Sequence, residues 1–335
     1  MKKNACEPTI THAREGIPGS LIARAAVLIL LCLPLWGFEK IPPQSVEIIP
    51  HWNKGDKIEL MVTRVRDKSL NGRSAVSGKT HTRFSLEVLH VSTQGYLVGW
   101  TVGATTFDVP APSESVLRQV VGLMQGVQIV LQIDPRGAIT GVHNWEVLRS
   151  EMLRNLDGLL AKRSDSQRGQ PNQGIMTNLR AQWDTMFSTK AQVEQVCTRD
   201  AQLYFRILGR TYTWDQPYEY QGFLENPLGG DPFPTRADIV LKSFNRRSEH
   251  AVLHWNQSAD REQTDRIMRS LVKDLAARKG KHVPEKGFLQ AVGLENHAEI
   301  EVDVGTGWVS KLTETKSVTL GTRAQTDTTF IVRSR

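Results

Sequence analysis

The chain has few cysteines, and this excludes a disulfide framework. Only Cys6, Cys32 and Cys197 occur in 335 residues. The first two lie in the N-terminal segment, residues 1–38, which has the character of a targeting segment. Removal of that segment leaves Cys197 without an intramolecular partner, so stability must come from packing. A folded chain of this length buries about three-quarters of its unfolded surface, which provides a sizeable core.

The chain also lacks clusters of charge of one sign. Lysine and arginine total 42 against 35 acidic residues, for a net charge of +7. Loss of residues 1–38 removes four positive and two negative charges, which lowers the net charge to +5. The remaining charges are interspersed, and no basic stripe with interleaved aromatic residues marks a nucleic-acid groove. We therefore expect no nucleic-acid partner.

A hydrophobic run long enough to span a membrane is absent. Residues 25–36 are uncharged and apolar, whereas a spanning helix needs about 20 such residues and a signal peptide about 7–15. This favours export, to the periplasm or cell surface, with residues 1–38 as a signal peptide or an N-terminal anchor. The anchor alternative stays open because the leading region is long and Leu35-Trp36-Gly37 is a poor cleavage site, so residues 21–38 could hold the chain on a membrane. Lipid attachment at Cys32 is rejected because the bulky Leu31 precedes it.

Catalytic signatures are missing as well. No Gly-x-Ser-x-Gly elbow is present. The segment from Gly72 to Gly78-Lys79-Thr80 resembles a phosphate-binding loop, but five residues separate Gly72 from Gly78 instead of four. A strand-like alternation also follows it where that motif needs a helix. We therefore expect the chain to bind no nucleotide, and we interpret residues 69–79 as a polar loop rich in glycine and serine.

Three other residues have the chemistry of a site but a simpler explanation. His250 and His254 share a face of a predicted strand, where about 13 Å would separate their Cβ atoms, too far to hold one metal ion. Cys197 could act as a nucleophile with His143 or His250 as its base. It lies in a segment predicted to be helical, however, where a small buried residue is the usual explanation. No catalytic, cofactor-binding or metal-ligating residue is therefore predicted.

The most informative pattern present is an internal repeat. Residues 84–137 and 239–307 carry the same sequence of elements: two strand-like runs, an amphipathic helical run, and a strand followed by an Asp-to-Gly turn. The helical positions that match are Val116, Leu117, Val120, Val121 and Met124 in the first copy and Ile267, Met268, Leu271, Val272 and Leu275 in the second. Because order, residue type and phase agree, the pattern predicts a duplicated strand, strand, helix, strand unit.

Two kinds of residue recur at equivalent positions of the repeat. Asp134 and Asp303 each precede a turn that ends in glycine, and we expect both carboxylates to cap their own turns. Trp100 and Trp255 end the second strand-like run of each copy, and we expect both to be core anchors. The alternatives, a shared ligand site for the aspartates and an apolar pocket wall for the tryptophans, are less favoured.

The predicted organisation follows from these patterns and from proline, glycine and polar stretches. A Ser113 cap begins the first amphipathic helix, which ends near Gly126, and Asn144 caps a later helix. The predicted segments are residues 1–38 as signal peptide or anchor, 39–56 as an extended lead-in, 57–160 as a first β-rich repeat with a trailing helix, 161–173 as a linker, 174–206 as a helical insert, and 207–335 as a second β-rich repeat with extra C-terminal strands.

The strand, Asp-x-x-Gly turn, strand modules resemble those of uncharacterised exported bacterial α+β proteins. More distantly, residues 57–333 are similar in pattern to the half-barrel carriers of lipids and lipoproteins in the bacterial periplasm. The fold class expected is α+β, with two copies of a β-hairpin–helix–strand unit that form curved antiparallel sheet covered by helices. The resemblance implies a concave apolar surface beneath those helices.

Three functions remain as hypotheses. The leading one is an exported, non-enzymatic protein that binds an apolar ligand such as a lipid, or an envelope protein partner, in the concavity of its sheet. The second is an exported hydrolase whose site is assembled from residues distant in sequence. The third is a structural component of the envelope.

Overall fold

The computed structural model describes residues 44–108, 122–166, 180–181, 183–224, 232–279 and 292–334. The expected signal segment and most of the first expected amphipathic helix lie outside this part of the chain. Residues 44–335 make up one compact unit. Among the described helices, none combines the length and the apolar character needed to cross a membrane.

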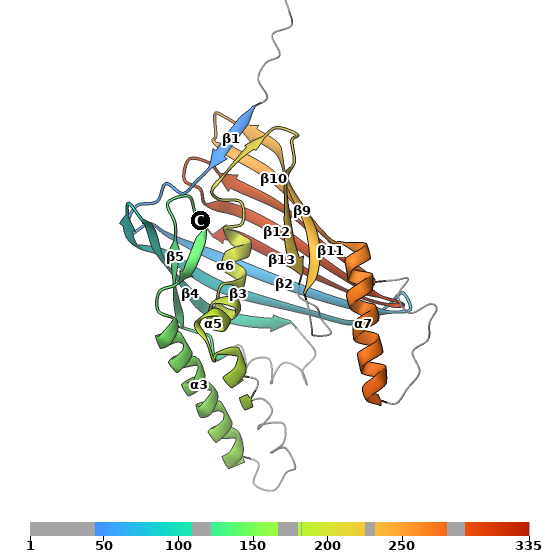
Figure 1. The fold of residues 1–335 in the computed structure, drawn as a ribbon. Coiled ribbons are helices and arrows are strands. Elements are labelled where there is room, and N and C mark those ends of the chain that lie inside the picture. The colour runs from blue at the N-terminus through green and yellow to red at the C-terminus, as the bar shows by residue number, and fades with distance from the viewer. Residues whose placement is uncertain are drawn as a thin grey trace, which may run out of the picture. The chain divides into compact units, whose positions relative to one another are not determined.

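One curved antiparallel sheet of eleven strands dominates the fold, which is α+β as predicted (Figure 1). Its order is β6-β5-β4-β3-β2-β13-β12-β11-β10-β9-β8. A separate two-stranded sheet pairs β1 with β7. The bounds of the strands are β1 (Ser45–Ile48), β2 (Lys57–Leu70), β3 (Arg73–Ser92), β4 (Gly95–Asp108), β5 (Gln128–Ile133), β6 (Ile139–Val142), β7 (Arg210–Thr213), β8 (Tyr218–Leu224), β9 (Phe233–Asn245), β10 (His250–Ala259), β11 (Val292–Asp303), β12 (Val309–Leu320) and β13 (Arg323–Ser334).

The strands of the sheet show the predicted duplication. Strands β3 to β5, which belong to the first copy, are neighbours in chain order, and so are strands β9 to β11 of the second copy. The registers agree as well, since Leu131 pairs with Val98 in the first copy and Ile300 with Leu253 at the equivalent positions of the second. The two copies meet where β2 pairs with β13. The expected extra C-terminal strands are therefore β12 and β13, and β13 completes the sheet.

The helices lie in two places along the sheet (Figure 1). Helices α3 (Trp145–Ser166), α5 (Lys190–Cys197) and α6 (Arg199–Tyr204) form one group, and α7 (Arg261–Lys279) lies apart from them. Thr189 caps α5 by accepting a hydrogen bond from the Gln192 amide at 3.3 Å. The Asn144 side chain does not cap α3 in this way; it bonds to Val130 N and Gln128 O of β5, which ties the start of α3 to the sheet.

An aromatic cluster fills the core beneath the first helix group. Phe205, which follows α6, contacts Trp52, Trp100, Tyr204 and Trp308, with ring centroids 5.0–6.4 Å apart. Trp52 stacks on Trp308 at 4.2 Å, so the lead-in segment, which includes β1, packs into the same core. Trp100 is 2% exposed and Trp255 is 1% exposed, which confirms the expected role of both as core anchors.

The expected polar loop over residues 69–79 is wrong. Only Asn71 and Gly72 form a turn, and both have a positive φ, at 51° and 74°. Two consecutive residues with a positive φ form a turn whose twist matches that of the paired strands, so strand pairing continues on both sides of the turn. A register shift between Lys68 and Ser69 is the one irregularity in this pairing, since Lys68 pairs with Val76 and Ser69 with Ser74.

The start of the expected linker also differs from the prediction. Helix α3 continues to Ser166, so residues 161–166 are helical. The apolar stripe of this helix ends at Leu159, and the polar residues that follow give no periodic signal for its last turns.

The aromatic core generates a stability prediction. Replacement of Trp100 by alanine should lower the free energy of unfolding by about 3–5 kcal/mol, because the large cavity cannot collapse completely. Replacement of Trp214 by alanine should lower it by clearly less, because the Trp214 side chain is 46% exposed and leaves no enclosed cavity. Urea unfolding followed by circular dichroism measures both. Equal effects of the two substitutions would contradict this account of the core.

Candidate functional site: the inner face of the sheet

The inner face of the sheet is the one whose side chains point into the core. Antiparallel pairing aligns the inward side chains of neighbouring strands in transverse rows. One row is entirely apolar, and each of its members is 0–1% exposed. It consists of Val62, Ile331, Leu312, Ile300, Leu253 and Leu241.

The next two rows toward α7 are largely polar, although they occupy the same inward phase of the strands. We call their polar members the polar band. They are Arg64 and Arg66 of β2, Thr329 and Asp327 of β13, Glu314 and Lys316 of β12, Asn296 of β11, and Gln257 of β10.

An arginine–aspartate pair joins β2 to β13 within the polar band. Arg66 donates two hydrogen bonds to Asp327, at 2.6 and 3.0 Å, and Gln325 donates a third at 2.8 Å. Burial raises the pKa of the Asp327 carboxyl, but the hydrogen bonds from Arg66 and Gln325 outweigh this and hold the pKa below its usual value. Such a group stabilises the fold at neutral pH, and the contribution is lost as the pH falls through its depressed pKa.

The most deeply buried charge of the polar band is Glu314, whose side chain is 2% exposed. Its Oε1 lies 3.6 Å from Arg206 Nη1, and its Oε2 lies 3.3 Å from Lys316 Nζ. The Arg206 guanidinium also lies over the ring of Trp255, 3.6 Å from its centroid. Burial lowers the pKa of Arg206, and the Glu314 carboxylate offsets part of that effect.

Helix α6 and the residues that follow it lie across the polar band, and two ion pairs hold them there. Arg64 pairs with Asp200 of α6 at 2.6 Å, and Arg206 pairs with Glu314. On the same face, toward β9, the Asn296 side chain donates a hydrogen bond to Gln257 at 3.2 Å, and the Gln257 side chain donates one to Thr235 of β9 at 2.8 Å. Side chains from several strands thus form a transverse polar network.

Beyond the polar band the inner face becomes apolar again. Phe233, Met268 and Leu294 are buried there, and several half-buried side chains surround them. Met268 comes from α7, so this α7 cluster lies between that helix and the ends of the strands. Its half-buried apolar members are Leu224, Ala259, Ile267, Leu271 and Val318.

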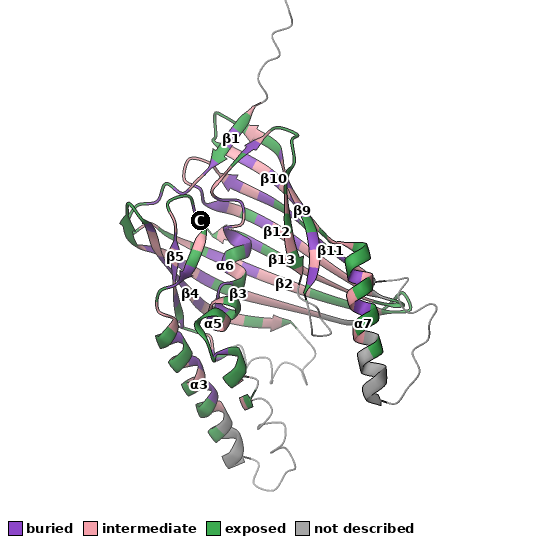
Figure 2. Cartoon of the chain, viewed as in Figure 1, coloured by how far each residue is buried: buried purple, intermediate pink, exposed green. Residues whose placement is uncertain are grey.

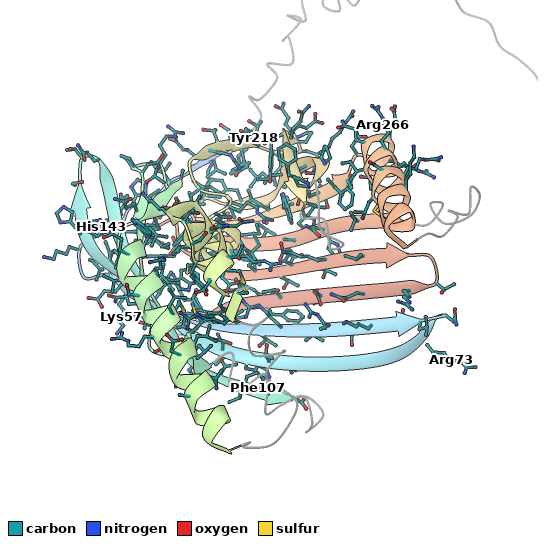
Figure 3. The ribbon with its side chains drawn as sticks, turned by 60° about the horizontal axis from the view of Figure 1, so that its bottom comes forward. Lys57, Arg73, Phe107, His143, Tyr218 and Arg266 are labelled. Carbon is teal, nitrogen blue, oxygen red and sulfur yellow. The ribbon has the colours of Figure 1, made fainter. Side chains whose placement is uncertain are left out.

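The figures show this change along the strands. In Figure 2 the buried residues are concentrated near α6, whereas the far ends of β2 and β13 are mostly intermediate or exposed. In Figure 3 the labelled Lys57 and Arg73 mark opposite ends of the long strands, with the labelled Arg266 of α7 toward the Arg73 end. One continuous face therefore presents an apolar core, a polar band and a second apolar cluster in succession.

Comparisons with known proteins give little beyond this geometry. No protein-family description matches the chain, and no curated protein matches it. A solved structure concerning lipid–protein interactions in lipovitellin is similar to 84% of this chain, with 8% sequence identity and a TM-score of 0.39. The match covers 25% of the lipovitellin chain, so the present chain spans about a quarter of that length. A likeness this weak carries no argument about function.

The two histidines lie on the outer face of β10, as expected for residues on the wetter side of a strand. His250 Nε2 is 3.7 Å from Glu301 and His254 Nε2 is 3.5 Å from Glu299, so each faces a carboxylate of its own on β11. Within the described part of the chain, no group of three histidine, cysteine or acidic side chains is arranged to hold a metal ion.

The other motifs also have structural roles. Asp134 accepts hydrogen bonds from Arg136 N and Ala138 N, and Asp303 accepts one from Thr306 N, which confirms their expected role in turns. Lys79 and Thr80 lie within β3 and begin no helix. Burial raises the pKa of the Cys197 thiol to about 11, which leaves almost no thiolate nucleophile at neutral pH.

Sequence reasoning missed the polar band, although a signal was present. In β2 the phase that carries Leu60 and Val62 continues with Arg64 and Arg66. In β12 the phase that carries Leu312 continues with Glu314 and Lys316. Charged residues at the inward-facing positions of two strands predict that the apolar core ends at those positions.

The buried pair in the polar band can be tested by a double-mutant cycle. Replacement of Arg206 by leucine should cost about 3 kcal/mol of unfolding free energy, because it leaves Glu314 buried with only Lys316 beside it. Replacement of both Arg206 and Glu314 by leucine should cost less than the sum of the two single changes. Urea unfolding of the four proteins measures the coupling. Strict additivity would show that the two side chains do not interact.

Proposed function

We propose that the protein is an exported, non-enzymatic carrier that binds an amphipathic ligand on the inner face of its sheet. One observation carries the proposal: the polar band lies on the same face as the half-buried α7 cluster and directly beside it. A ligand with a polar head and an apolar tail has the same succession of surfaces. Polar groups in such sites fix orientation, and apolar contacts supply most of the affinity.

The charge of the polar band favours an anionic head group. Four basic side chains gather on or above it against three acidic ones. Arg66 uses Nε and Nη2 for Asp327, so its Nη1 remains available to an incoming oxygen. Its side chain is 58% exposed, which makes it accessible. The basic side chains are Arg64, Arg66 and Lys316 of the polar band with Arg206 above it, and the acidic ones are Glu314 and Asp327 of the polar band with Asp200 above it.

The apolar part of the ligand would extend over the α7 cluster. Leu224, Leu271 and Val318 are only half-buried there. Complete burial of a Leu or Val side chain is worth about 1.5–3 kcal/mol. Each half-buried side chain therefore leaves part of that gain to be made with a ligand.

Export is part of the proposal and rests on the sequence of residues 1–38. A periplasmic or surface location fits an envelope lipid as the ligand. N-terminal sequencing of the protein isolated from its cells distinguishes the two remaining alternatives. A start near residue 39 would indicate a cleaved signal peptide, whereas an intact N-terminus would indicate an anchor at residues 21–38.

Native mass spectrometry of protein purified from the envelope tests the carrier directly. We expect a co-purifying anionic lipid or fatty acid that is released by organic solvent. A stable complex with another protein and without lipid would favour the partner-protein alternative. A ligand-free protein that fails to bind any added lipid would contradict the proposal.

Substitutions on the inner face should change ligand affinity without unfolding the protein. Replacement of Arg66 by glutamine should weaken binding of a fluorescent fatty acid roughly tenfold or more, since a hydrogen bond to a charged group contributes about 1.5–3 kcal/mol. The matched control is Arg247→Gln, an exposed arginine in the β9–β10 turn, which should leave the dissociation constant unchanged. Fluorescence titration measures both variants. Equal losses in the two would indicate a general charge effect.

A further inference from the structure

Two hairpin turns meet at the end of the sheet beside the α7 cluster. The β2–β3 turn contains Asn71 and Gly72, and the β12–β13 turn contains Gly321 and Thr322. The Asn71 amide donates a hydrogen bond to the Thr322 carbonyl at 2.9 Å. The paired strands β2 and β13 continue to these turns. The two turns therefore form a single end, which we call the hairpin tip.

The hairpin tip has an unusual composition for an exposed surface. Lys68, Arg73 and Arg323 are exposed, and Leu70 beside them is 45% exposed. Neither residues 68–78 nor residues 315–326 include an aspartate or glutamate. The hairpin tip thus presents an aliphatic side chain among basic ones, and the acidic residues of the two hairpins that lie nearest to it, Asp67 and Asp327, stand three to four residues back from Leu70 and Arg323.

We infer that the hairpin tip docks on an anionic membrane surface. Basic side chains are attracted by the negative potential of anionic lipids, and an aliphatic side chain beside them can enter the boundary between head groups and acyl chains. The occupant is assigned from this charge complementarity and from the exposed leucine. In Figure 3 the labelled Arg73 lies at the outer end of the long strands, where it can reach such a surface.

The opposite end of the sheet has a different composition. The β9–β10 turn there also carries two exposed basic residues, Arg246 and Arg247. The exposed Glu249 lies in the same turn and offsets part of their charge. Strand β9 runs from the α7 cluster to the β9–β10 turn, so this turn is remote from the hairpin tip. Its two arginines therefore provide a matched control.

Docking at the hairpin tip would place the α7 cluster next to the bilayer. Val318 belongs to this cluster and pairs with Gln325, two residues from Arg323. An apolar tail could therefore pass between the membrane and the cluster over a short path. This role in loading rests on the proposed carrier function, whereas the docking itself depends only on the hairpin tip.

Vesicle co-sedimentation of the full chain tests the docking. One set of vesicles contains phosphatidylcholine alone, and the other contains phosphatidylcholine with an equal amount of phosphatidylglycerol. The double variant R73S/R323S is compared with R246S/R247S, which removes the same charge at the opposite end. Leu70→Ser is compared with Val91→Ser, an exposed aliphatic residue near the β3–β4 turn. Residues 1–38 are present in every variant, so their contribution cancels in the comparison.

We expect R73S/R323S to bind the anionic vesicles roughly 30-fold more weakly than the unaltered chain, at about fivefold for each basic side chain near the surface. R246S/R247S should bind as the unaltered chain does, and Leu70→Ser should weaken binding while Val91→Ser does not. Added salt should weaken binding of the unaltered chain more than that of R73S/R323S.

Two results would overturn the inference: equal loss in both double variants, or the same binding to both kinds of vesicle. Fatty-acid titration in the absence of vesicles separates this outcome from failure of the carrier function. A protein that binds the fatty acid but shows no tip-dependent docking retains the carrier function and excludes the docking. A protein that docks but binds no fatty acid retains the docking alone.

Discussion

The pairing of β2 with β13 is the constraint on which the rest of the structure depends. It joins the first long strand of one copy of the repeat to the last strand of the other, along the whole length of β13. Arg66 and Asp327, which bond across it, are 261 residues apart in the chain. Closing a loop of that size costs on the order of 5 kcal/mol of entropy. The pairs along the whole of β13 must form together to offset that cost. Once formed, they join the two copies in a single sheet.

The shared sheet also explains why its inner face changes character along the strands. The apolar rows are covered by α3, α5, α6 and the aromatic side chains around Phe205. The strands continue past this cover, and inward positions there no longer need to be apolar. The charged pairs between strands stabilise that region in place of packing. Arg64 and Arg206 link it to the chain segment above, through ion pairs with Asp200 and Glu314.

Much of the fold could be predicted from the sequence, because the information was local. The repeat, its strand-like runs and the turns at Asp134 and Asp303 followed from periodicity and turn chemistry. The predicted polar loop over residues 69–79 is wrong because the Asn71-Gly72 pair is a stronger hairpin signal than the glycine and serine content around it. The polar band was missed because it exists only once the register of β2, β13 and β12 is known. The inward charges of β2 and of β12 can each be read from the sequence, but the pairing that brings them together leaves no signal in either strand.

The position of β13 has a consequence for quality control during synthesis. Residues 323–334 come late in the chain, yet they occupy the middle of the sheet and not its edge. A product truncated before them would leave β2 and β12 as two long unpaired edges facing one another across a gap. Unpaired edges of this length readily pair with other chains. An incomplete molecule would therefore be prone to aggregate, whereas loss of an edge strand such as β6 would leave the middle of the sheet intact.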